Sequence, residues 1–222
     1  MVTQERALEK GIARYSLYTM TFLAVGVAIH AMRYDAVPAN IYLGVDSAIR
    51  GVIERAPVQA LTHMIFGPIA LLAGPWQFFP RLRAKNPKLH RWAGRVYVAA
   101  CIVSGIGALF TAPFASGGPV ASVGFTMLAV LWIGTTFAGW RTAVARNFEL
   151  HRILMRFSYA MTFGAVTLRL QIPLGFVFFG FTSYREMSVW LAYTSWIPNV
   201  IVVALYTLAT TVRKRSTAAL AA

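Results

Sequence analysis

The sequence is poor in charge and nearly free of cysteine. Only 13% of its 222 residues are charged, about half the share of a soluble domain, whereas 58% are hydrophobic. Cys101 is the single cysteine, which excludes an internal disulfide and a thiolate site for zinc or an iron–sulfur cluster. There is no Gly-rich phosphate loop, no Ser-His-Asp spacing and no cluster of carboxylates. Hydrolysis or phosphoryl transfer of the kind that soluble enzymes perform is therefore not indicated.

What the sequence does contain is a series of long apolar stretches. A helix needs roughly 20 mostly apolar residues to cross the hydrocarbon layer, and the turn-forming run 115–119 divides the longest charge-free stretch in two. The sequence therefore predicts a single all-α transmembrane domain over 1–222. Six transmembrane helices are expected, at 15–32, 58–79, 92–114, 121–140, 153–174 and 187–210. The first should remain in the mature chain, because no Ala-x-Ala cleavage site follows it.

The net charge of +14 is explained by topology. Most of the 21 basic residues lie in the tails 1–14 and 211–222, and in or beside the loops after the second and fourth spans. The positive-inside rule makes these segments cytoplasmic, so both ends of the chain are predicted to lie on the cytoplasmic side of the membrane. Anionic lipid is then the expected partner of the basic residues, and nothing indicates binding to nucleic acid.

The longest polar segment, 33–57, is predicted to be an outer loop that contains an amphipathic helix. Its apolar residues recur at helical spacing, which is typical of a helix lying on the membrane surface. These residues are Ile41, Val45, Ile49, Val52 and Ile53. We interpret this helix as a lid over the bundle in preference to a partner-binding element.

An internal repeat relates two of the cytoplasmic loops. The segment 86–95 matches 147–156 at an offset of 61 positions, with identical Asn, Leu, His and Arg and a second Arg later in each copy. Each copy opens a helix that runs from inside to outside. Spans two and three, and spans four and five, are therefore predicted to form two parallel-repeat hairpins.

Two histidines stand at the cytoplasmic ends of the third and fifth spans. His90 and His151 are each followed by an arginine, Arg91 and Arg152. The residues leave two interpretations open. The arginines can anchor the helix ends in the lipid head groups, as long basic side chains commonly do. Alternatively, the four residues form an inner binding site for a haem, a quinone or a lipid head group.

A second set of polar residues is expected near the outer leaflet. At 1.5 Å per residue, His30 and Arg169 lie about 20–24 Å along helices that start inside, and His63 lies about 7 Å along a helix that starts outside. All three therefore reach a similar depth. Such groups are costly in hydrocarbon unless they face the bundle interior and find partners there. We expect them to form a binding site.

The polar motifs of the middle of the chain resemble those of a family of bacterial predicted membrane proteins, known as a domain of unknown function. The resemblance covers about residues 60 to 175 and rests on His63-x3-Gly67, Gly74-Pro75-x-Gln77-Phe78, Arg81-x-Arg83, Leu89-His90-Arg91-x2-Gly94-Arg95-x-Tyr97, His151-Arg152 and Leu168-Arg169-Leu170. It implies a polytopic bacterial membrane protein and carries no activity, cofactor or catalytic residue. More loosely, the histidine-bearing helices are similar to b-type transmembrane cytochromes, although no helix carries two histidines about 13 residues apart.

Three functions remain open at this point. The leading hypothesis is a redox-linked component that binds haem b or a quinone, through His63 with His30 and Arg169 or through His90 with His151. Haem iron is the only metal that enters this hypothesis. The second is a non-catalytic accessory or assembly subunit of a larger membrane complex, and the third is a small-molecule transporter. The residues identify no catalytic group and leave enzymatic activity undecided.

Overall fold

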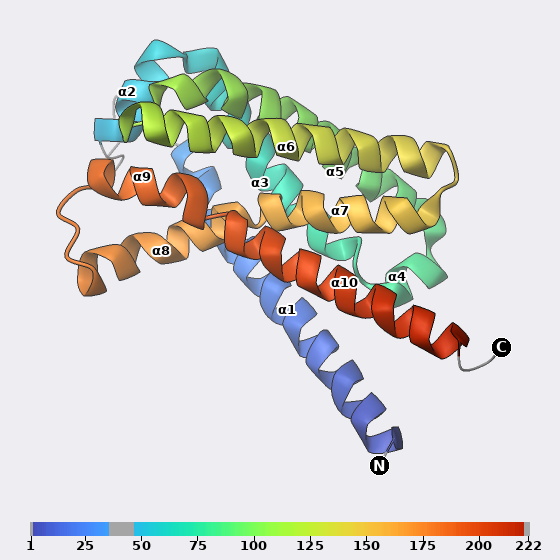
Figure 1. Cartoon of the computed structure of the whole chain (residues 1–222). Helices are drawn as coiled ribbons and strands as arrows, with labels where there is room; N and C mark the ends of the chain where they lie inside the picture. The colour runs from blue at the N-terminus through green and yellow to red at the C-terminus, as the bar shows by residue number, and fades with distance from the viewer. Residues whose placement is uncertain (1, 36–46, 220–222) are drawn as a thin grey trace.

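The computed structural model describes residues 2–35 and 47–219 (Figure 1). These residues are almost entirely helical and contain no strand, which confirms the all-helical class. The helices are α1 (Val2–Asp35), α2 (Ser47–Arg55), α3 (Pro57–Trp76), α4 (Pro80–Lys85), α5 (Pro87–Thr111), the 3₁₀ turn η2 (Ala112–Phe114), α6 (Gly118–Val144), α7 (Phe148–Thr162), α8 (Gly164–Phe178), α9 (Tyr184–Thr194) and α10 (Ile197–Ala219).

Within the described residues, five segments are long and apolar enough to cross a membrane. They are Pro57–Trp76, Pro87–Phe114, Gly118–Val144, Phe148–Phe178 and Tyr184–Arg213. Large apolar side chains face outward along them, for example Phe137 and Phe178, which suits a surface covered by lipid tails. The predicted first span, 15–32, lies within α1 and is not one of the five, so a sixth crossing stays a prediction.

Four of the helices form two hairpins that share one spacing. α3 and α6 begin at Pro57 and Gly118, 61 positions apart, and α5 and α7 begin at Pro87 and Phe148, again 61 apart. α3 packs along α5, and α6 packs along α7. α5, α6 and α7 run alongside one another (Figure 1). The 61-residue offset of the sequence repeat is therefore also the offset between the starts of the corresponding helices in the two hairpins.

The second helix of each hairpin begins with the same N-terminal cap. The Asn86 side chain accepts a hydrogen bond from the Leu89 amide at 3.0 Å, and that of Asn147 accepts one from the Leu150 amide at 3.2 Å. A capping asparagine satisfies one of the amide groups that a helix leaves unpaired at its start. The spacing between asparagine and histidine is the same in the two copies, and it places both histidines in the first turn of a helix.

Two of the membrane-crossing segments are broken in the middle. The break between α7 and α8 is at Phe163, and the break between α9 and α10 is at Ser195 and Trp196. The two breaks are packed together, because a Cβ added at Gly164 would lie 3.3 Å from the Ser195 carbonyl oxygen. Asn199 donates hydrogen bonds to two carbonyls at the breaks, those of Ala160 and Ser195. Such side-chain partners make broken backbone tolerable at membrane depth.

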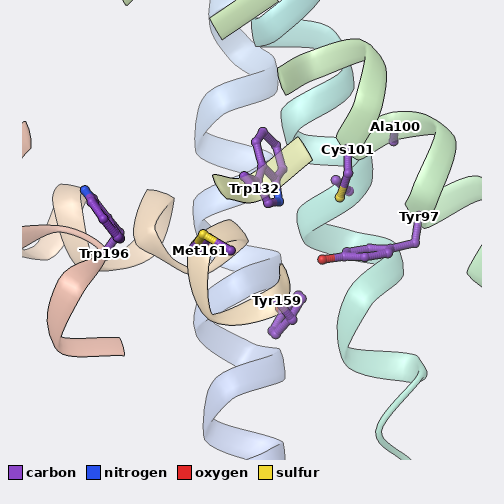
Figure 2. Packing of buried hydrophobic residues seen from close by; sticks show 8 residues of the cluster. Tyr97, Ala100, Cys101, Trp132, Tyr159, Met161 and Trp196 are labelled. Atoms are coloured by element: carbon purple, nitrogen blue, oxygen red, sulfur yellow. The ribbon is translucent and has the colours of Figure 1, made fainter. Parts of the chain in front are cut away.

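A layer of buried hydroxyl groups joins the two hairpins at their centre. The Tyr97 hydroxyl lies 2.8 Å from Ser158 Oγ and 2.9 Å from Thr162 Oγ1, and Figure 2 shows it directed toward the helix that carries Tyr159. The indole of Trp132 donates to Thr162 Oγ1 at 2.9 Å. Each interhelical hydrogen bond of this kind contributes about 0.6–2 kcal/mol in a membrane protein. The layer therefore holds α5, α6 and α7 together.

Candidate functional site

A cavity of about 570 Å³ lies at the end of the bundle where α3 begins and α1 ends. Residues of α1, α2, α3, α5, α6, α7, α8 and α9 surround it, and most of them are apolar. His30, His63 and Arg169 all line it. Its size and its lining of many apolar and few polar groups are those of small-molecule sites. The structure thus brings the three residues predicted for the outer site to one cavity, although whether they bind a ligand stays a prediction.

The His63 imidazole is fixed by a single residue of α5. Its Nδ1 lies 3.2 Å from the Ser104 carbonyl oxygen and 3.1 Å from Ser104 Oγ, and that hydroxyl donates to the His63 carbonyl at 3.1 Å. A carbonyl oxygen can only accept, so Nδ1 is assigned the proton. The other ring nitrogen, Nε2, then carries a lone pair. An imidazole held in this way can accept a proton or bind a metal.

Two glycines allow α3 and α5 to approach closely enough for this contact. A Cβ at Gly67 would lie 3.3 Å from Ser104 Oγ. At Gly107 a Cβ would lie 2.6 Å from the Gln59 carbonyl oxygen and 2.9 Å from the His63 amide nitrogen. Small residues at helix contacts are typical of membrane bundles. The spacing His63-x3-Gly67 therefore has a structural reason, since Gly67 leaves room for the hydroxyl that holds His63.

Arg169 enters the cavity from α8. Its guanidinium donates a hydrogen bond to the Ala165 carbonyl oxygen at 3.0 Å, one turn earlier on the same helix. The side chain is half-buried, and it is in electrostatic reach of His63. A charge at membrane depth persists where it meets polar groups or a polar cavity. Arg169 therefore supplies a positive charge and N–H donors to the cavity that His63 also lines.

The inner wall of the cavity carries short polar side chains that sequence reasoning did not predict. Thr162, Ser188 and Ser195 line it and are almost completely buried. Among the described residues, Ser195 Oγ has no hydrogen-bond partner. A serine within an apolar stretch gives no signal by itself, and the same holds for Ser104. Only the packing of the helices shows which of these hydroxyls meet a functional side chain.

The short helix α2 lies in the segment predicted as a lid. Val52 and Ile53 of α2 line the cavity, and α2 packs against the start of α3. Ile41 and Val45, which belong to the same predicted pattern, lie outside the described residues. The position of α2 suits the lid interpretation, because two of its apolar side chains line the cavity that His63 also lines.

The two inner histidines lie away from this cavity. The His151 Nδ1 is 2.7 Å from the Gly139 carbonyl oxygen, whereas the Nδ1 of His90 is buried without a partner among the described residues. The two imidazoles are in electrostatic reach of each other, and Arg91 is in reach of His90. Arg91 and Arg152 are exposed. This exposure suits contact with lipid head groups, and the inner binding site stays a prediction.

Other motif residues have packing roles. A Cβ at Gly74 would overlap the Tyr159 ring, so the glycine makes room for that aromatic side chain. A Cβ at Gly94 would lie 3.3 Å from the Gln77 amide oxygen, so the glycine leaves room for this side chain. Tyr97 is the centre of the buried hydroxyl layer. The motifs therefore mark close contacts between helices as well as candidate ligand groups.

Comparison with known proteins agrees with the resemblance seen in the sequence. Residues 60–207 match the model of a family described as Predicted membrane protein (DUF2306). No curated protein matches the chain, and no solved structure does. The looser resemblance to b-type cytochromes accordingly stays a hypothesis. Because the match covers most of the chain, including His63, the hydroxyl layer and both helix breaks, the protein belongs to this family of predicted membrane proteins.

Proposed function

We propose that the protein is a redox-linked membrane component that binds a quinone in the cavity lined by His30, His63 and Arg169. The observation that carries this proposal is that one guanidinium and two imidazoles meet a single, mostly apolar cavity. Quinones combine a polar ring with an apolar tail. The cavity combines the corresponding groups, since most of its wall is apolar and its polar side chains gather at few points.

The chemistry of the polar groups suits both redox forms of such a ring. The two carbonyl oxygens of a quinone accept hydrogen bonds, and Arg169 supplies N–H donors. The two hydroxyls of a quinol donate, and the lone pair on His63 Nε2 accepts. Ser104 holds the imidazole in the tautomer that this contact requires. Histidine also exchanges protons near neutral pH, which quinone reduction and quinol oxidation need.

Haem b is the second candidate, and one observation favours it. Metal-bound histidines usually donate their other ring N–H to a carbonyl or carboxylate, which is the contact between His63 Nδ1 and the Ser104 carbonyl. In this alternative His63 binds the iron and Arg169 pairs with a propionate. The quinone is placed first because it needs only one imidazole and one donor, whereas a bis-histidine haem needs two imidazoles on opposite faces of the ring.

The experiment is a pigment and lipid assay of the purified full-length protein. We expect a spectrum without a Soret band, and a solvent extract that contains quinone in about equimolar amount to protein. His63→Ala should lose the quinone. Arg185→Gln changes an exposed arginine that does not line the cavity, and this variant should retain the quinone. A Soret band that His63→Ala removes would select haem instead. A colourless protein without quinone would contradict both and favour an accessory or transport role.

The transport alternative has its own supporting observation. Two broken helices meet beside the cavity at Phe163 and Ser195, and substrate sites of many transporters lie at such breaks. Against it stands the absence of Asp and Glu from all six predicted spans, since carboxylates commonly couple transport to protons or sodium. The buried hydroxyl layer would equally suit an accessory subunit whose polar groups only hold helices together.

The finer topology belongs to the same proposal. We propose six spans in a bacterial inner membrane, with both ends in the cytoplasm and α3–α5 and α6–α7 as two parallel-repeat hairpins. The 61-residue spacing of the helix starts and the paired asparagine caps support the repeat. The basic residues at the starts of α5 and α7 support the orientation. α1 would supply the remaining span, which places His30 at the outer end of the bundle.

A further inference from the structure

A second cleft of about 720 Å³ lies between α1, α7 and α10, toward the other end of the bundle. It shares no lining residue with the cavity around His63. Figure 1 shows α1 and α10 diverging toward the two chain ends, so the cleft lies where these helices separate. Its lining is Tyr15, Ser16, Thr19, Met20, Leu23, Phe78, Arg156, Tyr159, Ala160, Phe163, Asn199, Val202 and Val203.

Among the described residues that line this cleft, Arg156 is the only charged one. It is half-buried, and it lies eight residues after the start of α7, about 12 Å along the helix. Its guanidinium lies 5.2 Å from the centroid of the Tyr206 ring on α10. Among the described residues it has no carboxylate or hydrogen-bond partner. The guanidinium thus combines a cation–π contact with Tyr206 and a position in the lining of the cleft.

The rest of the cleft changes from polar to apolar along its length. On α1, Tyr15, Ser16 and Thr19 come before the apolar Leu23. On α7, Arg156 likewise precedes the apolar Phe163, which lies at the helix break near the centre of the bundle. Along α1 and α7 the lining therefore passes from basic and hydroxyl-bearing residues to apolar ones. The polar side chain at the deep end, Asn199 of α10, already donates its hydrogen bonds within the protein. This polarity matches a molecule with an anionic head and a hydrocarbon tail.

We propose that this cleft binds an acidic phospholipid. The phosphate lies on the Arg156 guanidinium, and one acyl chain lies between α1 and α10 against Leu23 and Phe163. Arginine binds phosphate through two parallel N–H donors, and basic pockets between transmembrane helices hold lipid head groups in this manner. The site is independent of the quinone cavity, so either proposal can fail without the other.

The test measures lipid retained by the full-length protein in nanodiscs of mixed phosphatidylglycerol and phosphatidylcholine, by native mass spectrometry. Wild type should retain phosphatidylglycerol. Arg156→Gln should bind it at least about tenfold more weakly, because a charge-assisted contact is lost. Arg185→Gln is the control, since this arginine is exposed on α9 and does not line the cleft. It should bind as wild type does.

A second variant tests the position of the tail. Thr19 lines the cleft from an exposed position on α1, so Thr19→Trp should fill the cleft without disturbing the fold. It should reduce phosphatidylglycerol retention while leaving thermal stability unchanged. Equal retention by wild type, Arg156→Gln and Thr19→Trp would overturn the proposal. So would an increase in stability with inorganic phosphate as large as that with phosphatidylglycerol, because the tail would then contribute nothing.

Discussion

Tyr97 on α5 and Ser158 on α7 stand 61 positions apart, at equivalent places in the two hairpins, and their hydroxyls lie 2.8 Å from each other. The repeat therefore meets itself at the centre of the bundle. Ser158 also contacts Thr136 at 2.6 Å, so the hydrogen bond between the equivalent positions extends to α6. We infer that this pair sets the register between the hairpins.

The first prediction concerns this hydrogen bond. Tyr97→Phe should lower the free energy of unfolding by about 1–2 kcal/mol, because two interhelical hydrogen bonds are lost in a buried layer. Unfolding in detergent measures the effect, with Tyr18→Phe as the control at an exposed tyrosine. Combining Tyr97→Phe with Ser158→Ala should cost less than the sum of the single changes. Strictly additive losses would mean that the two hydroxyls act separately.

The second prediction concerns the close approach of α3 and α5. Gly107→Ala should destabilise the protein by about 1–3 kcal/mol, because its Cβ would meet backbone atoms of Gln59 and His63 that cannot move independently. Gly134→Ala is a matched control, since a Cβ at that helical glycine meets nothing within 4 Å. It should be neutral or slightly stabilising. Equal unfolding temperatures of the two variants would mean that the close α3–α5 contact does not limit the stability of the protein.

The helical segments could be predicted from the sequence because long charge-free stretches are a strong signal. Each of the six predicted segments overlaps a helix or a broken pair of helices, although 58–79 runs three residues past the end of α3. Prolines are a signal for a helix break, and the sequence has one in each of the two broken segments. Pro198 is the second residue of α10 and stands at the α9–α10 break, whereas Pro173 lies inside α8 and the α7–α8 break falls ten residues earlier at Phe163. The position of the α7–α8 break could therefore not be predicted. That break depends on Gly164 packing against Ser195, which only the tertiary structure shows.

The candidate site was predictable only in part, for a similar reason. His30, His63 and Arg169 are conspicuous because ionisable groups are rare at membrane depth, and all three line the cavity. Ser104 was not predictable, because a serine 41 positions away gains meaning only when α5 lies against α3. The repeat offset of 61 positions pairs Tyr97 with Ser158, so the sequence did contain a signal for the contact between these two residues.

A third prediction compares the two equivalent histidines. His151→Ala should lower stability by about 1 kcal/mol more than His90→Ala, because only His151 has a hydrogen bond to a backbone carbonyl among the described residues, that of Gly139. Thermal unfolding of the two variants in the same lipid measures the difference. If they form one inner site instead, each change alone should abolish its function, and the double variant should add little. Equal losses of stability would contradict the asymmetry.

The fourth prediction concerns topology and the sixth crossing. Reporter fusions at Asp46, Gly117 and Tyr184 should be active only outside the cytoplasm, and fusions at Lys85 and Arg146 only inside, as the distribution of basic residues indicates. The fusion at Asp46 decides whether α1 crosses the membrane. Cytoplasmic activity there would contradict the crossing by α1 and with it the six-span topology.

The last prediction concerns Arg169, whose planar guanidinium donates one N–H to the Ala165 carbonyl and carries its other N–H donors in a fixed fork. Arg169→Lys keeps the charge in the cavity but loses the fork of donors, so one ammonium would have to serve both the carbonyl and the quinone. We expect about tenfold less quinone in the purified protein, with little change in unfolding temperature.

Arg185→Lys is the control, because Arg185 is an exposed arginine at the start of α9 and does not line the cavity. It should retain quinone as wild type does. Full quinone occupancy in Arg169→Lys would show that the positive charge alone suffices to bind quinone. The proposal that Arg169 acts as a directed hydrogen-bond donor would then be wrong. Loss of quinone together with loss of folding would instead assign Arg169 to structure, so the unfolding temperature of each variant must be measured beside its quinone content.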